Sequence, residues 1–543
     1  MSADAERRHE IKRIVSAAMP GILYVEACLS SIEAAATEFL KDGAWLDGWF
    51  AVRRAIQFDG KDWKPEVKRR VNAIEVQLRP SDPHNVAKAY VLGKRGSSFD
   101  ILDLEADIEG KTDYAAASDR LAQKAEALGR DFGNQNELLN QFLPEALRSD
   151  YTNHAFSFGG GLAQSSAPLT DTWHTLRKAL VNVPVEERNA TILGGFLHQI
   201  FKTDASLGST ILDEVLIDPD MTQHLVYLQV QAGIDSDAIE RLRKAISSGC
   251  VTAHGFYVLT SGVVRSAPQV KLAMLLDELC GLENGTSVAL EILHMALYCL
   301  KTDGVEVEGA LLDIGHQLLL RTKYTNNSDV REHRVQQTIK ECYSGPSGEQ
   351  GARELCKLLK LKISAHEVSG FDIDYALFAL FEVQPIIALN EFLLSAETDE
   401  DHSIYGSGGL TRQSPLEKVA SSVLWSWADQ APSVRYPLIS RSLNVFSTKD
   451  FDDDNGLSLR FLEGLERSPD RAEFLRSNPA RMHPNGWSGH LSAILDRRRG
   501  HLETLADHSD PNVRIWVAEQ ISDLKRWADY ERTRESEREE TFE

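Results

Sequence analysis

The sequence predicts an all-α protein whose helices stack as an irregular helical-repeat solenoid. Apolar residues recur at helical spacing through most of the 543 residues, which marks the buried face of one helix after another. Short turns rich in Gly, Asn or Ser separate helices of roughly 12 to 18 residues, as in stacked helical hairpins. A capping side chain followed by proline at N1 predicts a helix start. Six such pairs occur: Asp82-Pro83, Asp218-Pro219, Ser414-Pro415, Ser468-Pro469, Asn478-Pro479 and Asp510-Pro511.

Apolar stripes predict the helices of the N-terminal half. The first stripe comprises Ile22, Val25, Leu29, Ile32, Ala36 and Phe39. The second comprises Trp173, Leu176, Leu180 and Val183, and the broader third comprises Ile192, Leu193, Phe196, Leu197, Ile200 and Phe201. The best candidate for a strand is 99–108, where acidic residues separate Ile101, Leu104 and Ile108 in the alternating pattern of a half-buried strand.

The run from Ser236 to Lys323 shows the expected stacking most clearly. Five helices are predicted in it: one ending near Gly249, one around 256–259, one over 268–279, one over 289–300 and one over 307–321. The fourth is apolar on almost every side, so we expect neighbours to bury it from two directions.

The most apolar stretch of the chain is 375–394. Polar residues and a proline interrupt it, namely Glu382, Pro385, Asn390 and Glu391. A bilayer span tolerates such residues poorly, so the stretch predicts a pair of core helices. Further on, Trp425 and Trp427 are expected to give one buried ring and one exposed ring.

Composition shifts divide the chain into three expected parts. These are an N-terminal helical region over 1–156, a central helical-repeat array over 157–396, and C-terminal helices with a charged tail over 397–543. The Gly- and Ser-rich segment 156–170, the short break 344–351 and the acidic, then Gly-rich segment 397–414 are predicted to be loops. The tail from Trp527 onward is predicted to be an exposed, frayed helical extension.

Charge and cysteine content narrow the function classes. The net charge of -22 disfavours general binding to nucleic acid or to an acidic membrane. Six scattered cysteines without a Cys-x-x-Cys pair indicate reduced thiols of a cytoplasmic protein rather than a disulfide framework or a structural zinc site. The charged N-terminus lacks the apolar segment of a secretory signal.

The segment 501–527 resembles a HEAT repeat. Leu502, Leu505 and Ala506 would lie on its first helix, and Asp510-Pro511 would cap the second, followed by Val513-Arg514. The inner face of that second helix would carry Val517, Ile521 and Leu524. The resemblance implies HEAT-like helices in the C-terminal part and a HEAT/TPR-like character for the array.

The overall sequence pattern of the chain is similar to that of the helical sensor and scaffold arrays of bacterial STAND-type NTPases and related anti-phage defence proteins. The segments that prompt this resemblance are FGGGLA at 158–163, the stretch 173–197 and the stretch 225–249. The resemblance implies binding of a protein partner within a larger assembly, and it transfers no catalytic residue.

Searches for chemistry give weak patterns only. The segment from Gly93 to Ser98 has the wrong spacing for a phosphate-binding loop, and Gly159–Gly161 lacks a lysine. Asp450, Asp452 and Asp454 resemble the opening of a calcium loop, but Asn455 and Phe461 stand where glycine and glutamate are needed. These acids are therefore interpreted as a solvated loop before a helix.

Two further patterns leave alternatives open. Asp100 or Asp103 with Glu109 and Lys111 resembles the metal site of a nuclease. The Arg497–Arg499 triplet near Trp487 and Trp516 would suit a nucleic-acid-binding adaptor if these residues converge. Short basic groups at Arg53-Arg54 and 68–70, and the histidines His483, His490, His501 and His508, are expected on the surface or at helix caps.

The sequence thus predicts a cytoplasmic, non-catalytic scaffold or sensor that binds a protein partner. No catalytic, cofactor-binding or metal-binding residue is assigned, and no cofactor or membrane is expected. A metal-dependent nuclease and a nucleic-acid-binding adaptor remain the alternatives.

Overall fold

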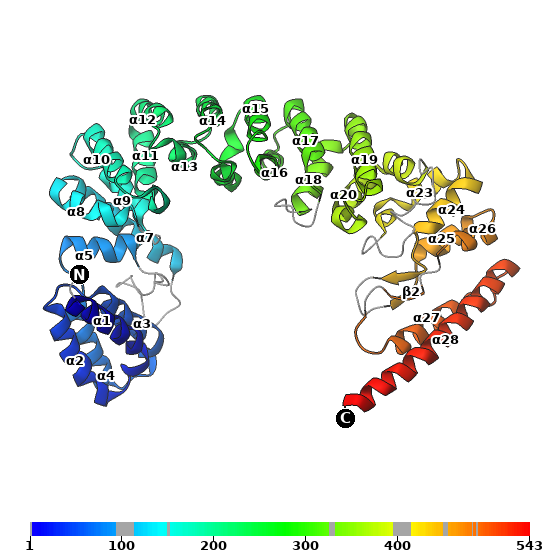
Figure 1. Cartoon of the computed structure of the whole chain (residues 1–543), viewed down its shortest axis with the longest axis horizontal. Helices are drawn as coiled ribbons and strands as arrows, with labels where there is room; N and C mark the ends of the chain where they lie inside the picture. The colour runs from blue at the N-terminus through cyan, green and yellow to red at the C-terminus, as the bar shows by residue number, and fades with distance from the viewer. Residues whose placement is uncertain are drawn as a thin grey trace. The chain divides into compact units, whose positions relative to one another are not determined.

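The computed structural model describes residues 3–93, 113–148, 153–324, 332–394, 414–448, 454–479, 482–484 and 487–542. Within these ranges almost all regular structure is helical (Figure 1). The described residues contain two strands, β1 (Phe446–Thr448) and β2 (Asp454–Leu457), which pair in antiparallel orientation. The prediction of an all-α fold is therefore confirmed. The chain divides into two compact units, Met1–Leu259 and Thr260–Glu543.

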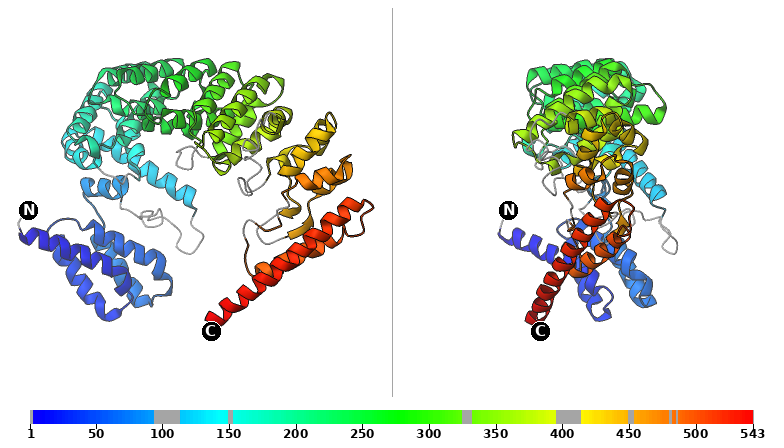
Figure 2. Two further views of the ribbon diagram at one scale, coloured as in Figure 1. Left: turned by 45° about the vertical axis from the view of Figure 1, so that its right-hand side comes forward. Right: turned by 90° about the vertical axis from the view of Figure 1, so that its right-hand side faces the viewer.

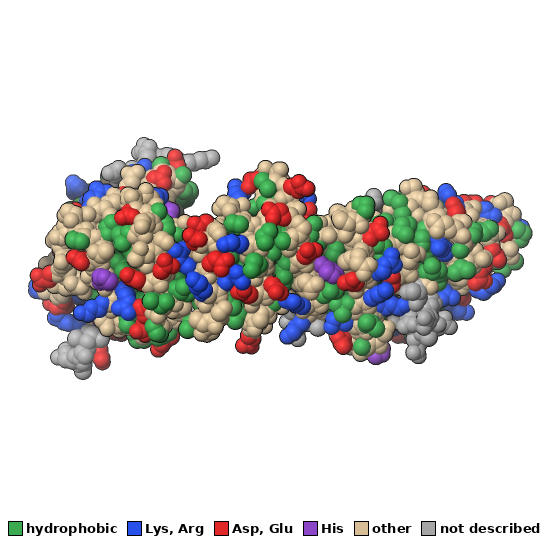
Figure 3. All heavy atoms as spheres, turned by 90° about the horizontal axis from the view of Figure 1, so that it is seen from above, with side chains coloured by type: hydrophobic (Ala, Val, Ile, Leu, Met, Phe, Trp, Pro, Cys, Tyr) green, Lys and Arg blue, Asp and Glu red, His purple; other side chains and the backbone are tan. Residues whose placement is uncertain are grey.

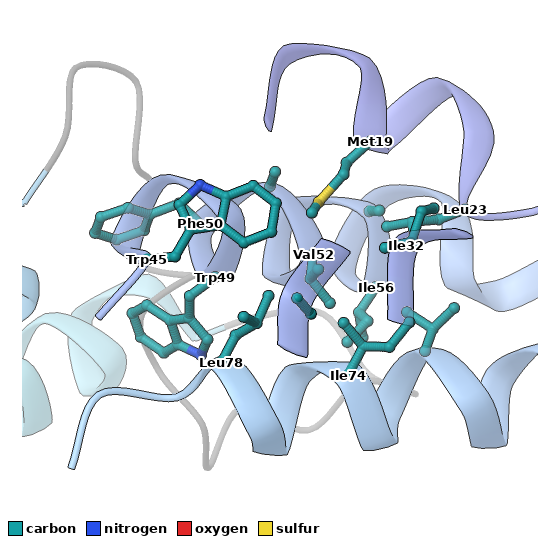
Figure 4. Packing of buried hydrophobic residues seen from close by; sticks show 14 of the residues in the cluster. Met19, Leu23, Ile32, Trp45, Trp49, Phe50, Val52, Ile56, Ile74 and Leu78 are labelled. Atoms are coloured by element: carbon teal, nitrogen blue, oxygen red, sulfur yellow. The ribbon is translucent and has the colours of Figure 1, made fainter. Parts of the chain in front are cut away.

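Four helices form the first layer of the N-terminal unit: α1 (Ala3–Ile22), α2 (Glu26–Leu40), α3 (Leu46–Asp59) and α4 (Pro65–Leu78). They enclose a core in which Met19, Trp49 and Ile74 lie close together (Figure 4). Of the first predicted stripe, Leu29, Ile32 and Ala36 are buried on α2, whereas Ile22 ends α1 and Val25 precedes α2.

The rest of this unit consists of helices that contact the second helix along the chain as well as the next one. Their bounds are α5 (Pro83–Ala87), η2 (Lys88–Leu92), α7 (Tyr114–Gly133), α8 (Asn136–Ala146), α9 (Ala155–Leu162), α10 (Leu169–Val181), η3 (Val185–Glu187), α11 (Thr191–Thr203), α12 (Ala205–Ile217), η4 (Thr222–His224), α13 (Leu225–Ala232) and α14 (Ser236–Ser248). α7, α9, α11 and α13 pack in succession, and α8 contacts α10 as α12 contacts α14. The stripes predicted on α10 and α11 are buried, except that Phe201 is half-buried; Val183, which is buried, follows the end of α10.

The prediction of a loop over 156–170 is wrong for its first half, because α9 runs through the FGGGLA sequence. A Cβ atom at Gly161 would lie 2.0 Å from the carbonyl oxygen of Glu126 on α7. On the opposite side, a Cβ atom at Gly159 would lie 2.0 Å from the carbonyl oxygen of Ile192 on α11. These glycines therefore allow the backbones of α7, α9 and α11 to approach closely, and they do not form a turn.

In the C-terminal unit the same packing recurs. Its first helices are α15 (Gln269–Leu279), α16 (Gly285–Asp303), α17 (Gly309–Arg321), α18 (Glu332–Tyr343), α19 (Glu349–Ser364), α20 (Gly370–Val383) and α21 (Pro385–Ala388), and η8 (Leu389–Leu394) follows α21. The helices form two layers. In one layer each helix contacts the next in the order α15, α17, α19 and α21, and in the other layer the order is α16, α18 and α20. Neighbours bury α16 on most of its circumference, as predicted. The stretch 375–394 divides at Gln384 into core helices, also as predicted.

The last part of the unit comprises shorter helices and one long hairpin. Their bounds are η9 (Pro415–Lys418), α23 (Ser421–Ala428), α24 (Pro432–Ser442), α25 (Leu459–Arg467), α26 (Arg471–Ser477), α27 (Leu491–Glu503) and α28 (Pro511–Phe542). α27 and α28 lie side by side (Figure 2). Among the described helices, none has both the length and the apolar character needed to cross a membrane.

The proline pairs have two roles rather than one. Asp82-Pro83, Ser414-Pro415 and Asp510-Pro511 begin α5, η9 and α28. The other three pairs stop a helix instead: Asp218, Ser468 and Asn478 are extended residues that end α12, α25 and α26. A residue before proline avoids the α region, so the same dipeptide also ends a helix, and three of the six predicted starts are wrong.

The prediction of one exposed tryptophan ring is wrong. Both Trp425 and Trp427 are buried: the indole N–H of Trp425 donates to Glu463 and that of Trp427 to Asn390, each at a distance of 2.8 Å. The tail beyond Trp527 is helical and mostly exposed, as predicted, but it is not frayed, since α28 continues to Phe542. The backbone N–H of Ser492 on α27 donates to Glu535 over 3.1 Å.

The three-part division stays a prediction. Its boundary at 156/157 falls inside α9, and its boundary at 396/397 lies outside the described residues. The expected break at 344–351 coincides with the turn between α18 and α19. All six cysteines are free thiols, and Cys299, Cys342 and Cys356 are buried.

Candidate interaction surface

The outer side of α15 carries apolar side chains that none of the described helices covers. Val270 and Met274 are 52% and 43% exposed, although Leu272, Leu275 and Leu276 on the same helix are buried. Val270, Met274 and Asp277 are spaced by four and three residues, so they share one face. That face is therefore an apolar strip which ends in a carboxylate.

Polar side chains link this helix to the next two in its layer. Asp277 of α15 accepts a hydrogen bond from Arg321 of α17 over 2.8 Å. His316 of α17 lies 3.0 Å from Glu354 of α19. The hydrogen bond with Asp277 raises the pKa of Arg321, and hydrogen bonds from Gln350 and then His316 lower the pKa of Glu354. These pairs stabilise the charged forms along the outer edge of the layer.

A buried tyrosine fixes the position of His316. The hydroxyl of Tyr343 on α18 lies 2.8 Å from Nδ1 of His316, while Nε2 of the same ring faces Glu354. Burial raises the pKa of Tyr343 well above its ordinary value, so the hydroxyl stays protonated. α17, α18 and α19 therefore share one polar chain that runs from the interior to the surface.

The exposed side of α19 continues the mixed surface. Leu361 is 68% exposed and shares a helix face with Glu354 and Lys357, which lie seven and four residues earlier. We define the α15–α19 face as the exposed side chains of Val270, Met274 and Leu361 together with the linked pairs Asp277–Arg321 and His316–Glu354. The space-filling view in Figure 3 shows hydrophobic, acidic and basic side chains intermingled on the side of the molecule that it presents.

The other layer of this unit has its own polar links, and they are more deeply buried. Arg334 of α18 lies 3.1 Å from the nearly buried Glu291 of α16. His294 of α16 is buried, its ring centroid lies 6.0 Å from that of His333, and burial followed by the charge of Arg334 lowers its pKa to about 4.

The side-chain bonds between helices two apart recur at a nearly constant sequence separation. In the C-terminal unit they join residues 37 to 44 positions apart, as in Trp427–Asn390, His316–Glu354, Lys301–Glu341 and Arg321–Asp277. In the N-terminal unit the separation is more variable: 28 for Arg241–Asp213, 34 for Arg130–Gln164 and 41 for Arg177–Asp218. The separation between linked residues is thus more regular in the C-terminal unit than in the N-terminal unit.

Several patterns singled out in the sequence lie outside the described residues. These are 94–98, the strand-like segment 99–108, the carboxylates Asp100, Asp103 and Glu109 with Lys111, and Asp450 with Asp452. The sequence predicts the acidic cluster to be a loop directly before a helix. For its last member this is wrong, because Asp454 begins the strand β2. Ser458 caps α25 instead.

The four histidines and the arginine triplet do not converge. His508 accepts a hydrogen bond from the backbone of Asp510, as a capping residue would, and lies 2.8 Å from Glu466. Among the described residues no group of three or more His, Cys, Asp and Glu side chains is placed to hold a metal ion. Arg498 is buried against the ring of Phe446 and donates to the carbonyl of Met482.

Arg499 lies beside the carboxylates of Asp496 and Glu503, and Arg497 is exposed. Because Arg498 is buried, the triplet does not present three exposed guanidinium groups together. Of the other basic groups, Arg53 is buried and Arg70 is paired with Glu33 over 2.8 Å.

Sequence reasoning missed the exposed apolar residues of the α15–α19 face. Met274 and Leu361 stand inside apolar runs and read as core residues. The signal that distinguishes them is their position off the buried stripe, which on α15 comprises Leu272, Leu275, Leu276 and Leu279 and on α19 comprises Ala352, Leu355, Cys356 and Leu359. No model of a known protein family and no curated protein matches this chain.

Proposed function

We propose that the chain is a HEAT/TPR-like α-solenoid that binds a protein partner through the α15–α19 face. The observation that carries this proposal is the recurrence of inter-helix bonds at a separation of 37 to 44 residues in the C-terminal unit. HEAT-type repeats have a period of about 40 to 47 residues and TPR repeats one of 34. A repeat of two helices buries one face of each helix and leaves an extended outer surface for recognition.

The composition of this surface supports a protein as partner. Exposed Met and Leu side chains beside ion pairs resemble the apolar core and polar rim of protein interfaces. Val270 and Met274 lie one helical turn apart on α15, and exposed apolar side chains that are grouped mark interaction sites. In the proposed role the chain acts in the cytoplasm as a non-catalytic scaffold or sensor of a larger bacterial assembly, of the kind that serves anti-phage defence.

Affinity capture from host cells, with and without phage, tests this proposal when it is combined with surface variants. Met274→Glu and Leu361→Glu place charges on the α15–α19 face without touching the core. Tyr298→Glu is the matched control, since Tyr298 is 59% exposed on α16 of the other layer. We expect one protein to be captured with the wild type and the control and lost with both face variants.

Two results would overturn the proposal. One is that no protein is captured specifically by the wild type in either state of the cells. The other is that capture is equally strong with both face variants. Circular dichroism of each variant verifies that its helix content is unchanged.

A further inference from the structure

The helix α28 carries a second, separate surface. Its buried face packs on α27 and includes Val513, Val517, Leu524 and Ala528. Beside this face runs a stripe whose members are spaced by four, four, three, four and four residues: Glu519, Asp523, Trp527, Tyr530, Arg534 and Arg538. Such spacing keeps all six on one side of a helix. We call this set the α28 stripe.

The centre of the stripe is aromatic and exposed. Trp527 and Tyr530 are 44% and 54% exposed, and their ring centroids lie 6.1 Å apart in an edge-to-face arrangement. The guanidinium of Arg534 lies 5.7 Å from the centre of the Tyr530 ring. Exposed Trp, Tyr and Arg side chains are the residue types that contribute most to protein interfaces.

Charge along the stripe changes sign at this aromatic centre. The two members before the rings are acidic, Glu519 and Asp523, and the two after them are basic, Arg534 and Arg538. A second α28 laid antiparallel over the first, with its midpoint at the rings, places Arg534 of the second copy against Asp523 and Arg538 against Glu519. Trp527 then faces Tyr530 of the second copy.

We infer that the α28 stripe binds a second copy of this chain as an antiparallel, two-fold symmetric pair. In such a pair every contact occurs twice, because each copy presents the same surface. The stripe from Glu519 to Arg538 spans about 28 Å at a rise of 1.5 Å per residue. α27 covers a different side of α28, so it stays in place when the pair forms.

The stripe already makes contacts of its own: the ring centroid of Trp527 lies 5.1 Å from that of His483, and two of its charged members form ion pairs. Asp523 is paired with Arg526 over 2.8 Å and Arg534 with Glu531 over 3.1 Å. Arg526 and Asp523 are 74% and 50% exposed, and exposed ion pairs of this kind contribute little to stability. Arg534 is 43% exposed, whereas its partner Glu531 is 15% exposed. The side chains of Asp523 and Arg534 are therefore both accessible to the second copy. The pairing does not depend on the partner proposed for the α15–α19 face.

Sedimentation equilibrium of the full chain, at low and high salt, tests this inference. We expect a wild-type mass of twice 60.5 kDa at low salt. Asp523→Arg and Arg534→Asp each place like charges opposite one another at two sites, so each variant weakens the dimer by about tenfold or more. Lys525→Asp is the control, because Lys525 is exposed on another side of the same helix.

Variants in which the two charges are exchanged provide the decisive comparison. The double variant Asp523→Arg/Arg534→Asp restores opposite charges at both sites, and an equimolar mixture of the two single variants forms a mixed dimer. A monomeric wild type, a dimer that both single variants leave intact, or a double variant that stays as weak as the singles would each overturn the inference. Capture of another protein through Trp527 by a monomeric chain would assign the stripe to a different partner and overturn it as well.

Discussion

Gly159 of α9 lies so close to Ile192 of α11 that a Cβ atom at Gly159 would stand 2.0 Å from the Ile192 carbonyl oxygen. Real Cβ atoms do not approach a backbone oxygen so closely, so the two helices must separate when the glycine is replaced. On the neighbouring Gly160 a Cβ atom meets nothing nearer than 3.8 Å. The two adjacent glycines therefore provide a matched pair for testing the helix contact.

We expect Gly159→Ala to lower the free energy of unfolding by about 1 to 3 kcal/mol, the usual cost of overpacking. Gly160→Ala should leave it unchanged or raise it by up to about 1 kcal/mol, since alanine favours helix. Urea denaturation of both variants measures the difference. Equal stability of the two would show that α9 and α11 are not in close contact.

The indole of Trp49 depends on one acceptor. Its N–H donates to Oε1 of the buried Glu75 over 2.8 Å, and Arg79 holds the other oxygen of that carboxylate. Glu75→Ala leaves the N–H buried without a partner, so we expect a loss of about 1 to 3 kcal/mol in unfolding free energy. Glu75→Gln keeps an oxygen acceptor and should lose less. A larger loss for Gln than for Ala would contradict this reading of the contact.

The hydroxyl of Tyr343 holds His316 between two helices. Tyr343→Phe removes one hydrogen bond and leaves the ring in place, so thermal or urea unfolding should show a loss of about 0.5 to 1.5 kcal/mol. Tyr298→Phe serves as the control, because Tyr298 is exposed. If both variants lose the same amount, the hydroxyl of Tyr343 contributes nothing specific.

Acid should destabilise the C-terminal unit through His294. Its folded-state pKa is about 4, below the ordinary value of 6.5, so the folded state favours the neutral ring. Between pH 6.5 and about 4 the unfolded chain binds a proton that the folded chain does not, and stability falls as pH falls. The titratable and charged groups that act on the ring are Arg334, His333 and Glu341.

We therefore expect His294→Asn to be less sensitive to pH than the wild type. In unfolding experiments from pH 7 to pH 4, the wild type should lose about 2 to 3 kcal/mol more than the variant across this window. The rest of the decline, from other groups, is common to both proteins. Parallel stability curves for the two proteins would show that His294 titrates normally in the folded state.

A helix and its buried face could be predicted where the apolar residues of that segment alone determine which side is buried. The stretch 289–300 is apolar on nearly all sides, and the structure buries it on most of its circumference. The FGGGLA segment was not predictable in this way. Its glycines accommodate α7 and α11, which are separate in sequence, so local composition reads as a loop.

The same limit explains the errors in exposure and in the candidate sites. Trp427 is buried because Asn390, 37 residues earlier, lies over it. Leu361 is exposed because, within the part of the chain that the structure describes, its side of α19 has no covering helix. The links of the α15–α19 face join residues 38 and 44 positions apart, and such separations become visible only when the helices are stacked.

Direct titration of the captured partner into the purified chain tests the central claim, namely that the α15–α19 face of a layered helical array binds a protein. Isothermal calorimetry compares wild type, Leu361→Glu, Met274→Glu and Tyr298→Glu. We predict that the Kd rises by about tenfold or more with each face variant, because a charge must be desolvated in an apolar contact, and that it is unchanged with Tyr298→Glu. Equal affinity for the wild type and both face variants would contradict the claim.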